Sequence, residues 1–192
     1  PTNEGKAQGM DPLTCEDDPR ISASGLRLSR PVLLITILAV AIRLLHARVL
    51  FYSPTADMCV YVEVAENIFR AHDLPRLNQS IYFPPGYPLW LFLTWQLLHI
   101  GLVSPVLYLQ AIVGGLAVIP LIAATRNLYS DKAGFVAGIF YALYIPYVYS
   151  SSLLLSEALV IPLLCVVFWS CIRAALHPNS VWAAVSGLLL SW

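Results

Sequence analysis

Long apolar runs, separated by short polar segments, dominate this chain of 192 residues. The first run, Pro31–Tyr52, has 22 residues, and about 20 apolar residues in a helix span the hydrocarbon core of a bilayer. No small-residue cleavage site follows it, which favours a retained transmembrane helix over a removed signal peptide. The later apolar runs are Tyr87–Val103, Pro105–Thr125, Ala133–Tyr149, Leu153–Ala175 and the stretch from Val181 onward. This pattern predicts an all-α fold, a polytopic bundle of transmembrane helices.

A polar segment between the first two apolar runs predicts a different kind of helix. Within Ser53–Phe69, the spacing of Asp57, Tyr61 and Ala65 is four residues, which places them on one helical face. Ser53 is a suitable cap for such a helix, with a proline at the next position. The segment ends in the helix-breaking sequence PPGYP at residues 84–88. We therefore expect an amphipathic helix that lies beside the membrane.

The run Tyr87–Val103 decides the topology, because its 17 residues are at the lower limit for spanning. If it spans, Arg126 and Lys132 lie on the side opposite to the basic residues that precede the first helix. If it lies in the interface, all these cations lie on the inner side, which the positive-inside rule favours. We therefore expect a mobile cytoplasmic tail at residues 1–30, a membrane domain at 31–192, and a first outer loop at about 53–104.

The composition supports a membrane protein and excludes several other classes. Hydrophobic residues make up 58% of the chain and charged residues 11%, against about 25% charged in a typical soluble domain. Eleven basic and eleven acidic residues cancel, so the basic excess of a nucleic-acid binder is absent. The four cysteines show no CxxC spacing, which argues against a disulfide framework or a zinc site. The chain begins at Pro1 and ends inside an apolar run, so we expect the N-terminal part of a longer protein.

Two acidic residues are the main candidates for chemistry. Asp57 lies in a predicted first helical turn, where an acid is commonly found because it interacts favourably with the helix dipole; the functional alternative is a general base at the membrane surface. Glu157 opens an apolar helix, where ionisable groups are functional candidates. The alternative is a surface acid that follows Ser156 as a helix cap. In the favoured topology both acids face the same compartment.

Other residues near the predicted outer surface have a structural and a functional interpretation. Arg43 lies deep in the first helix and needs a partner, which could be a lipid phosphate or a carboxylate. Tyr87 fits the aromatic belt at a membrane interface, and the same ring could stack on a sugar.

The order of these features resembles a known family. The elements are D-x-x-x-Y-x-x-x-A-x-N-I from Asp57 to Ile68, PPGYPLWLF at 84–92, a helix ending at Arg126, and Ser-Glu at 156–157. Together they resemble the GT-C glycosyltransferases of the protein-mannosyltransferase and aminoarabinose-transferase type. The resemblance implies a transferase that moves a sugar from a polyprenyl-phosphate carrier to a lipid or protein acceptor. It places the reaction on the outer face of a bacterial plasma membrane, in protein glycosylation or lipopolysaccharide modification.

The resemblance also assigns roles to residues. Asp57 becomes the candidate catalytic base, and Glu157 a candidate for binding or orienting a substrate, with Tyr61, Arg43 and Tyr87 as further substrate-binding candidates. Many relatives carry a second acid after the loop aspartate, but Met58 stands there in this chain. No cofactor or metal is therefore required by the residues, although a divalent metal is not excluded.

Two alternatives remain at this stage. A multi-pass transporter or lipid-carrier permease would place ionisable residues and broken helices near the bilayer midplane. In a non-enzymatic membrane assembly subunit, the two acids would have no catalytic or substrate-binding role.

Overall fold

A computed structural model describes residues 28–49, 57–71, 86–98, 103–176 and 180–190. In these ranges the regular elements are all helices, which confirms the predicted all-α fold. The helices are α1 (Arg30–Val49), α2 (Asp57–Ala71), α3 (Gly86–Leu98), α4 (Val103–Leu116), α5 (Val118–Leu128), α6 (Asp131–Leu143), α7 (Ile145–Ser150), α8 (Glu157–Leu176) and α9 (Ser180–Leu190). Residues 1–27 of the predicted tail at 1–30, and the predicted cap Ser53, lie outside the described residues.

Three stretches in the described ranges are long and apolar enough to cross a membrane: Arg30–Val49, Ser104–Leu128 and Glu157–Leu176. The second joins α4 and α5 across Ala117, and hydrogen bonds continue through the junction, from Ala117 N–H to the Val113 carbonyl at 3.2 Å. The interruption has a local cause, because Pro120 has no N–H to donate to the carbonyl four residues earlier.

The apolar run Ala133–Tyr149 forms two helices, α6 and α7. Tyr144 between them has φ −69° and ψ 104°, an extended conformation. Pro146 explains the break, because it has no N–H to donate to the Ala142 carbonyl four residues earlier and its ring would clash with that carbonyl in a continuous helix. The break leaves carbonyl groups at the end of α6 without helical partners.

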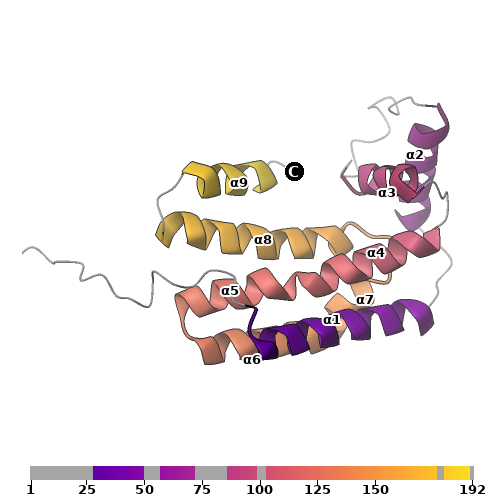
Figure 1. Ribbon diagram of the computed structural model, residues 1–192. Coiled ribbons are helices and arrows are strands. Elements are labelled where there is room, and N and C mark those ends of the chain that lie inside the picture. The colour runs from indigo at the N-terminus through magenta and orange to yellow at the C-terminus, as the bar shows by residue number, and fades with distance from the viewer. Residues whose placement is uncertain (1–27, 50–56, 72–85, 99–102, 177–179, 191–192) are drawn as a thin grey trace, which may run out of the picture.

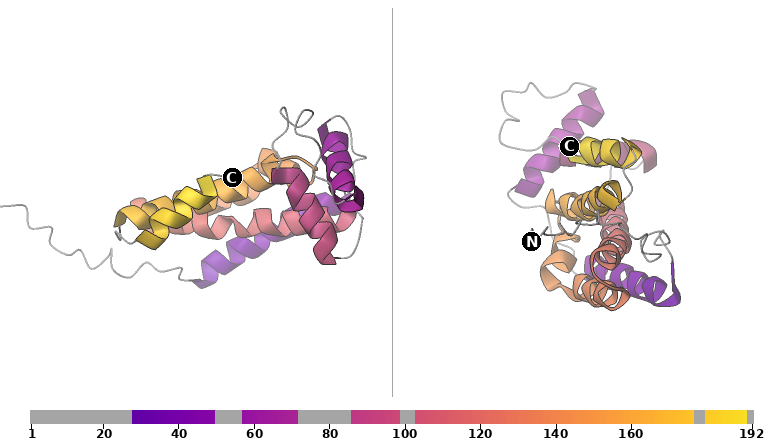
Figure 2. Two further views of the ribbon diagram at one scale, coloured as in Figure 1. Left: turned by 90° about the horizontal axis from the view of Figure 1, so that it is seen from above. Right: turned by 90° about the vertical axis from the view of Figure 1, so that its left-hand side faces the viewer.

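The helices form a bundle with two short helices across one end (Figure 1). Most helices lie roughly side by side along one axis, in the order α9, α8, α4 with α5, and then α1 with α6 (Figures 1 and 2). Helices α2 and α3 lie across this axis. The end of α1 and the beginnings of α4 and α8 lie at the same end of the bundle as α2 and α3. We call this the α2–α3 end.

Helix α3 is too short to cross a bilayer. Its 13 residues correspond to about 20 Å of helix, against about 30 Å of hydrocarbon. Helix α1 therefore ends, and α4 begins, at the same end of the bundle (Figure 1). This arrangement matches the interfacial alternative for the run Tyr87–Val103.

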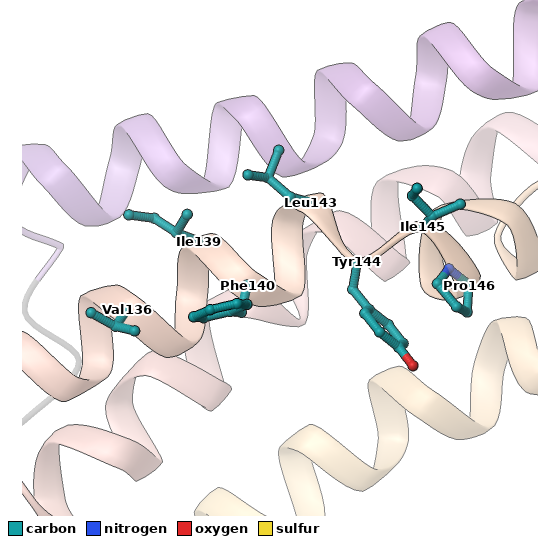
Figure 3. A pocket seen from close by; sticks show the side chains of 7 residues that line it. All are labelled: Val136, Ile139, Phe140, Leu143, Tyr144, Ile145 and Pro146. Carbon is teal, nitrogen blue, oxygen red and sulfur yellow. The ribbon is translucent and has the colours of Figure 1, made fainter.

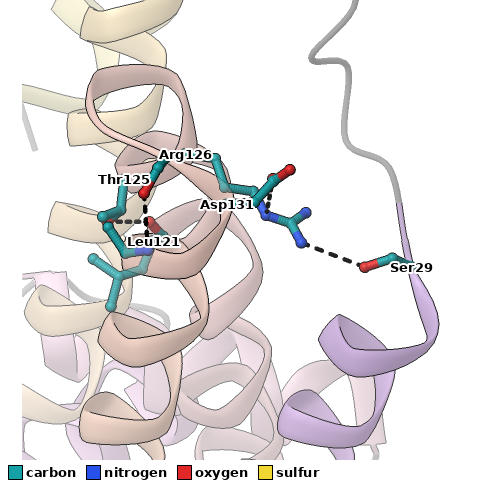
Figure 4. A network of polar contacts seen from close by, with 7 residues as sticks. Ser29, Leu121, Thr125, Arg126 and Asp131 are labelled. Carbon is teal, nitrogen blue, oxygen red and sulfur yellow. Dashed lines mark hydrogen bonds and ion pairs between the residues drawn. The ribbon is translucent and has the colours of Figure 1, made fainter.

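The opposite end of the bundle is fixed by Arg126 (Figure 4). Its Nε lies 3.1 Å from Oδ1 of Asp131 in the first turn of α6. Its Nη2 donates to Ser29 Oγ, next to the start of α1, at 3.4 Å. Arg30, Arg126 and Lys132 thus gather at one end of the bundle, as the positive-inside rule requires of a single membrane face.

Candidate functional site

A hydrophobic cluster holds the helices together at the α2–α3 end. Its buried members come from α2, α3, α4, the segment 151–156 and α8: Tyr61, Ala65, Tyr87, Leu91, Trp95, Val106, Leu107, Leu154 and Leu159. Met58 and Leu155 pack against it from the side. The cluster therefore contains the residue after Asp57 and residues on both sides of Glu157.

Both candidate acids are exposed first residues of helices at this end. Asp57 begins α2, while its neighbour Met58 packs into the cluster. Glu157 begins α8, between Leu155 and Leu159 of the cluster. Asp57 and Glu157 are 100 positions apart in sequence, and packing of the nearby Met58, Leu155 and Leu159 in one cluster places the starts of both helices at this end of the bundle.

Ser156 caps α8 through its backbone. Its carbonyl accepts hydrogen bonds from Leu159 N–H at 3.0 Å and Val160 N–H at 2.9 Å. Its hydroxyl instead donates to Oε2 of Glu157 at 3.3 Å. The side chain expected to cap the helix therefore contacts the carboxylate that carries the proposed function.

Gln110 of α4 links three parts of the site. Its side-chain Nε2 donates to the carbonyls of Ser151 at 3.0 Å and Leu153 at 2.7 Å, and its Oε1 accepts from the Tyr87 hydroxyl at 3.0 Å. The side chain is completely buried. Sequence reasoning missed this residue, although a single amide inside a long apolar run was a usable signal.

Tyr61 and Tyr87, two predicted substrate-binding residues, pack against each other in the interior. Their ring centroids are 5.1 Å apart in an edge-to-face arrangement, and the exposed fractions are 5% and 2%. Burial raises the pKa of the Tyr87 phenol, and the neighbouring Tyr61 raises it further, so Tyr87 remains a hydrogen-bond donor to Gln110. Neither ring presents a surface for stacking on a sugar, and a substrate-binding role for either stays a prediction.

The segment 151–156 also contacts the end of α1. His46 Nδ1 lies 2.7 Å from the Ser152 hydroxyl oxygen, and its ring meets that of Tyr149 edge-on at 6.0 Å. Ser151 and Ser152 are both buried. Contacts from α1 and α4 therefore hold the segment that leads into Glu157.

Arg43 lies inside the bundle, with 1% of its surface exposed. Nη1 donates to the Ala39 carbonyl at 3.0 Å and Nη2 to the Tyr141 carbonyl at 3.2 Å. The guanidinium also lies 4.8 Å from the centre of the Tyr141 ring. A cation near the last carbonyls of a helix is favoured by the helix dipole, and Tyr141 lies in the last turn of α6.

The sequence predicted an anionic partner for Arg43. In the described part of the chain, both of its hydrogen bonds go to backbone carbonyls and none to a carboxylate. Arg43 therefore serves the packing of α1 against the end of α6, and contact with a lipid phosphate stays a prediction.

An apolar hollow of about 610 Å³ lies on another side of the bundle, along α6 and α7 (Figure 3). It is lined by Val136, Ile139, Phe140, Leu143, Tyr144, Ile145 and Pro146. Its lining contains neither of the two acids, so it is separate from the candidate site.

Metal ligands do not gather in the described ranges. No group of three or more His, Cys, Asp or Glu residues there could hold a metal ion. Met58, which stands where many relatives carry a second acid, packs against the cluster of the α2–α3 end.

A comparison with protein-family models gives a match over most of the chain. The family model described as oligosaccharyl transferase STT3, N-terminal, matches residues 64–192, about two thirds of the chain. The matched range includes Tyr87, Gln110 and Glu157 and begins after Asp57. No curated protein and no solved structure matches the chain.

Proposed function

Because the chain belongs to the family of the N-terminal part of oligosaccharyl transferase STT3, we propose that it transfers a glycan from a polyprenyl-phosphate carrier to an acceptor. The family makes the chain a member of the GT-C glycosyltransferases, and its three apolar spans fit an integral membrane protein. We propose further that the α2–α3 end faces outward from a plasma membrane, and that the acceptor is a lipid or a protein.

One observation carries this proposal. Two exposed carboxylates, Asp57 and Glu157, begin helices that both contribute side chains to one hydrophobic cluster at one end of the bundle, Met58 and Tyr61 from α2 and Leu159 from α8. The bundle's clustered cations Arg30, Arg126 and Lys132 lie at the other end. A transporter would be expected to carry its substrate-binding acids near the midplane, whereas both of these acids lie at the end of the bundle, which supports an enzyme that works at the membrane surface.

The proposed reaction is an inverting displacement at the sugar carbon bonded to the carrier phosphate. The acceptor nucleophile forms a bond to that carbon, and the carbon–oxygen bond to phosphate breaks. The phosphate leaves with the electron pair, and the Asp57 carboxylate takes the proton from the nucleophile. Glu157 accepts a hydrogen bond from a substrate hydroxyl or amide and orients it, since alignment contributes much of the rate in such transfers.

The test compares two acids on α2 in the intact protein, reconstituted in lipid with a labelled donor. Asp57→Asn should lower kcat by about 10²–10⁴-fold, the usual range for a lost general base. Glu63→Gln is the matched control, because Glu63 is an exposed acid on the same helix, and it should transfer normally. A polyprenyl-phosphate monosaccharide and a lipid-linked oligosaccharide are tested in parallel to identify the donor. Equal transfer by Asp57→Asn and the unmodified protein would refute the assignment.

A further inference from the structure

Gln110 is unusual because a membrane-spanning stretch buries its amide completely. It belongs to the apolar span Ser104–Leu128 and has no exposed surface. An amide carries two N–H donors and one carbonyl acceptor, and burial without partners would be costly. Here both donors and the acceptor have partners, at 3.0, 2.7 and 3.0 Å.

The partners explain why an amide stands at this position. The segment 151–156 lies between α7 and α8 and is not helical, so the carbonyls in its first half do not have the regular partners that a helix provides. Gln110 bonds two of these carbonyls, those of Ser151 and Leu153. A leucine or valine would fill the space in an apolar run but would leave both carbonyls unpaired.

The third hydrogen bond of Gln110 joins this segment to α3, which packs against α2, the helix that begins at Asp57. Tyr87 of α3 donates to Gln110, and the Tyr87 ring packs edge-on against Tyr61 of α2. Tyr61 lies one helical turn after Asp57, and Leu153 lies four residues before Glu157. A continuous chain of contacts therefore runs from α2 through α3 and Gln110 to the segment that leads into α8.

We propose that Gln110 is a positioning residue of the glycosyl transfer, which fixes the segment before Glu157 relative to the α2–α3 unit that begins at Asp57. This inference rests on the proposed function, because it assigns the two carboxylates to one reaction. Alignment within such a site is sensitive, and a displacement of about 1 Å can cost on the order of 100-fold in rate. A single amide that forms hydrogen bonds with both Tyr87 of α3 and the segment 151–156 keeps the two at a fixed relative position.

The first measurement needs no substrate. Hydrogen–deuterium exchange of residues 151–156 is compared in the intact protein and in Gln110→Met, which has a similar length and no polar group. The N–H groups of Ser152 and Leu153 donate hydrogen bonds to the carbonyls of Tyr149 and Ser150. Their exchange rate should rise by about tenfold when the hydrogen bonds from Gln110 to this segment are lost. Ser170→Ala is the control, because it removes another buried polar contact, to Ser186 between α8 and α9, and should leave this segment unchanged.

The second measurement is a double-mutant cycle on transfer. If Gln110 acts through Glu157, Gln110→Met should lower kcat/KM by on the order of tenfold alone, but by less than about twofold when Glu157→Gln is already present. Ser170→Ala should combine additively with Glu157→Gln. Tyr87→Phe, which keeps the ring and removes one bond to Gln110, should give a smaller effect of the same kind. It replaces Gln110→Met if that variant does not fold.

The two proposals fail in different ways. Absence of transfer by the unmodified protein with either donor would overturn the proposed function and the catalytic role of Gln110 with it. The role of Gln110 alone would be overturned by either of two results in a protein that transfers normally when unmodified. One is additive effects of Gln110→Met and Glu157→Gln on kcat/KM, and the other is unchanged exchange of residues 151–156 in Gln110→Met and Tyr87→Phe.

Discussion

Gly114 and Gly115 are adjacent in α4, yet the structure predicts opposite effects for alanine at the two positions. A Cβ at Gly115 would lie 2.5 Å from Val40 Cγ2 and 2.8 Å from Val40 Cα. Ordinary contacts begin at 3.4 Å, so α1 and α4 would have to separate by roughly 0.6–0.9 Å. A Cβ at Gly114 would meet Arg43 and Ser151 atoms at 3.6 and 3.7 Å, which is ordinary contact.

These distances set the expected magnitudes. Overpacking costs about 1–3 kcal/mol, and replacing a helical glycine by alanine returns about 0.5–1 kcal/mol. Gly115→Ala should therefore lower the midpoint of thermal unfolding in detergent by several degrees, at about 2–4 °C per kcal/mol for a chain of this size. Gly114→Ala should leave the midpoint unchanged or raise it by up to about 4 °C.

A second substitution separates side-chain from backbone crowding. Val40→Ala removes the Cγ2 contact but keeps the contact with Val40 Cα, so it should restore only part of the stability that Gly115→Ala loses. Equal midpoints for Gly114→Ala and Gly115→Ala would refute the close approach of α1 and α4 at Gly115.

Two substitutions at Arg43 test whether its charge stabilises the bundle. Arg43→Met should change the unfolding midpoint little, because loss of the bond to the Tyr141 carbonyl, at about 1–3 kcal/mol, is offset by relief of burying a cation, which costs several kcal/mol. Arg43→Lys should lower the midpoint more, since lysine keeps the charge without the fork that reaches both carbonyls. A larger loss for Arg43→Met than for Arg43→Lys, measured by the same unfolding assay, would contradict this explanation.

Much of the fold could be predicted from hydrophobic patterning. The expected helices over Pro31–Tyr52, Pro105–Thr125 and Leu153–Ala175 correspond to the three candidate spans. The break at Tyr144 was missed because Ala133–Tyr149 is uniformly apolar, and only Pro146 signals the interruption. The hydrophobic pattern shows how long an apolar segment is, but it does not show where the helix within that segment is interrupted.

The candidate site was less accessible to sequence reasoning. Exposed acids at helix starts, Asp57 and Glu157, could be found from the sequence because their context is local. Burial of Tyr87 and the bonds of Gln110 could not be found, since their partners lie 23 to 43 residues away. The hydrogen bonds that Arg43 makes to the carbonyls of Ala39 and Tyr141 could not be found from the sequence either, because the Tyr141 carbonyl is freed only by the break after α6.

The family match supports the predicted class at a coarse level. The resemblance to GT-C glycosyltransferases is confirmed, and a transporter or a non-enzymatic subunit is not favoured. The protein-mannosyltransferase or aminoarabinose-transferase subtype, the bacterial origin and the polyprenyl-phosphate donor stay predictions. The family description names an oligosaccharyl transferase, which is why both donor types belong in the transfer assay.

The central claim is that Asp57 and Glu157 face one compartment, and thiol labelling tests it most directly. Variants of the intact protein with one cysteine each, at native Cys59, at Glu157→Cys or at Lys132→Cys, are placed in sealed vesicles of known orientation. Cys59 and Lys132 are both exposed. A membrane-impermeant maleimide should label positions 59 and 157 from the same side and position 132 from the other. Labelling of positions 59 and 157 from opposite sides would contradict the shared site.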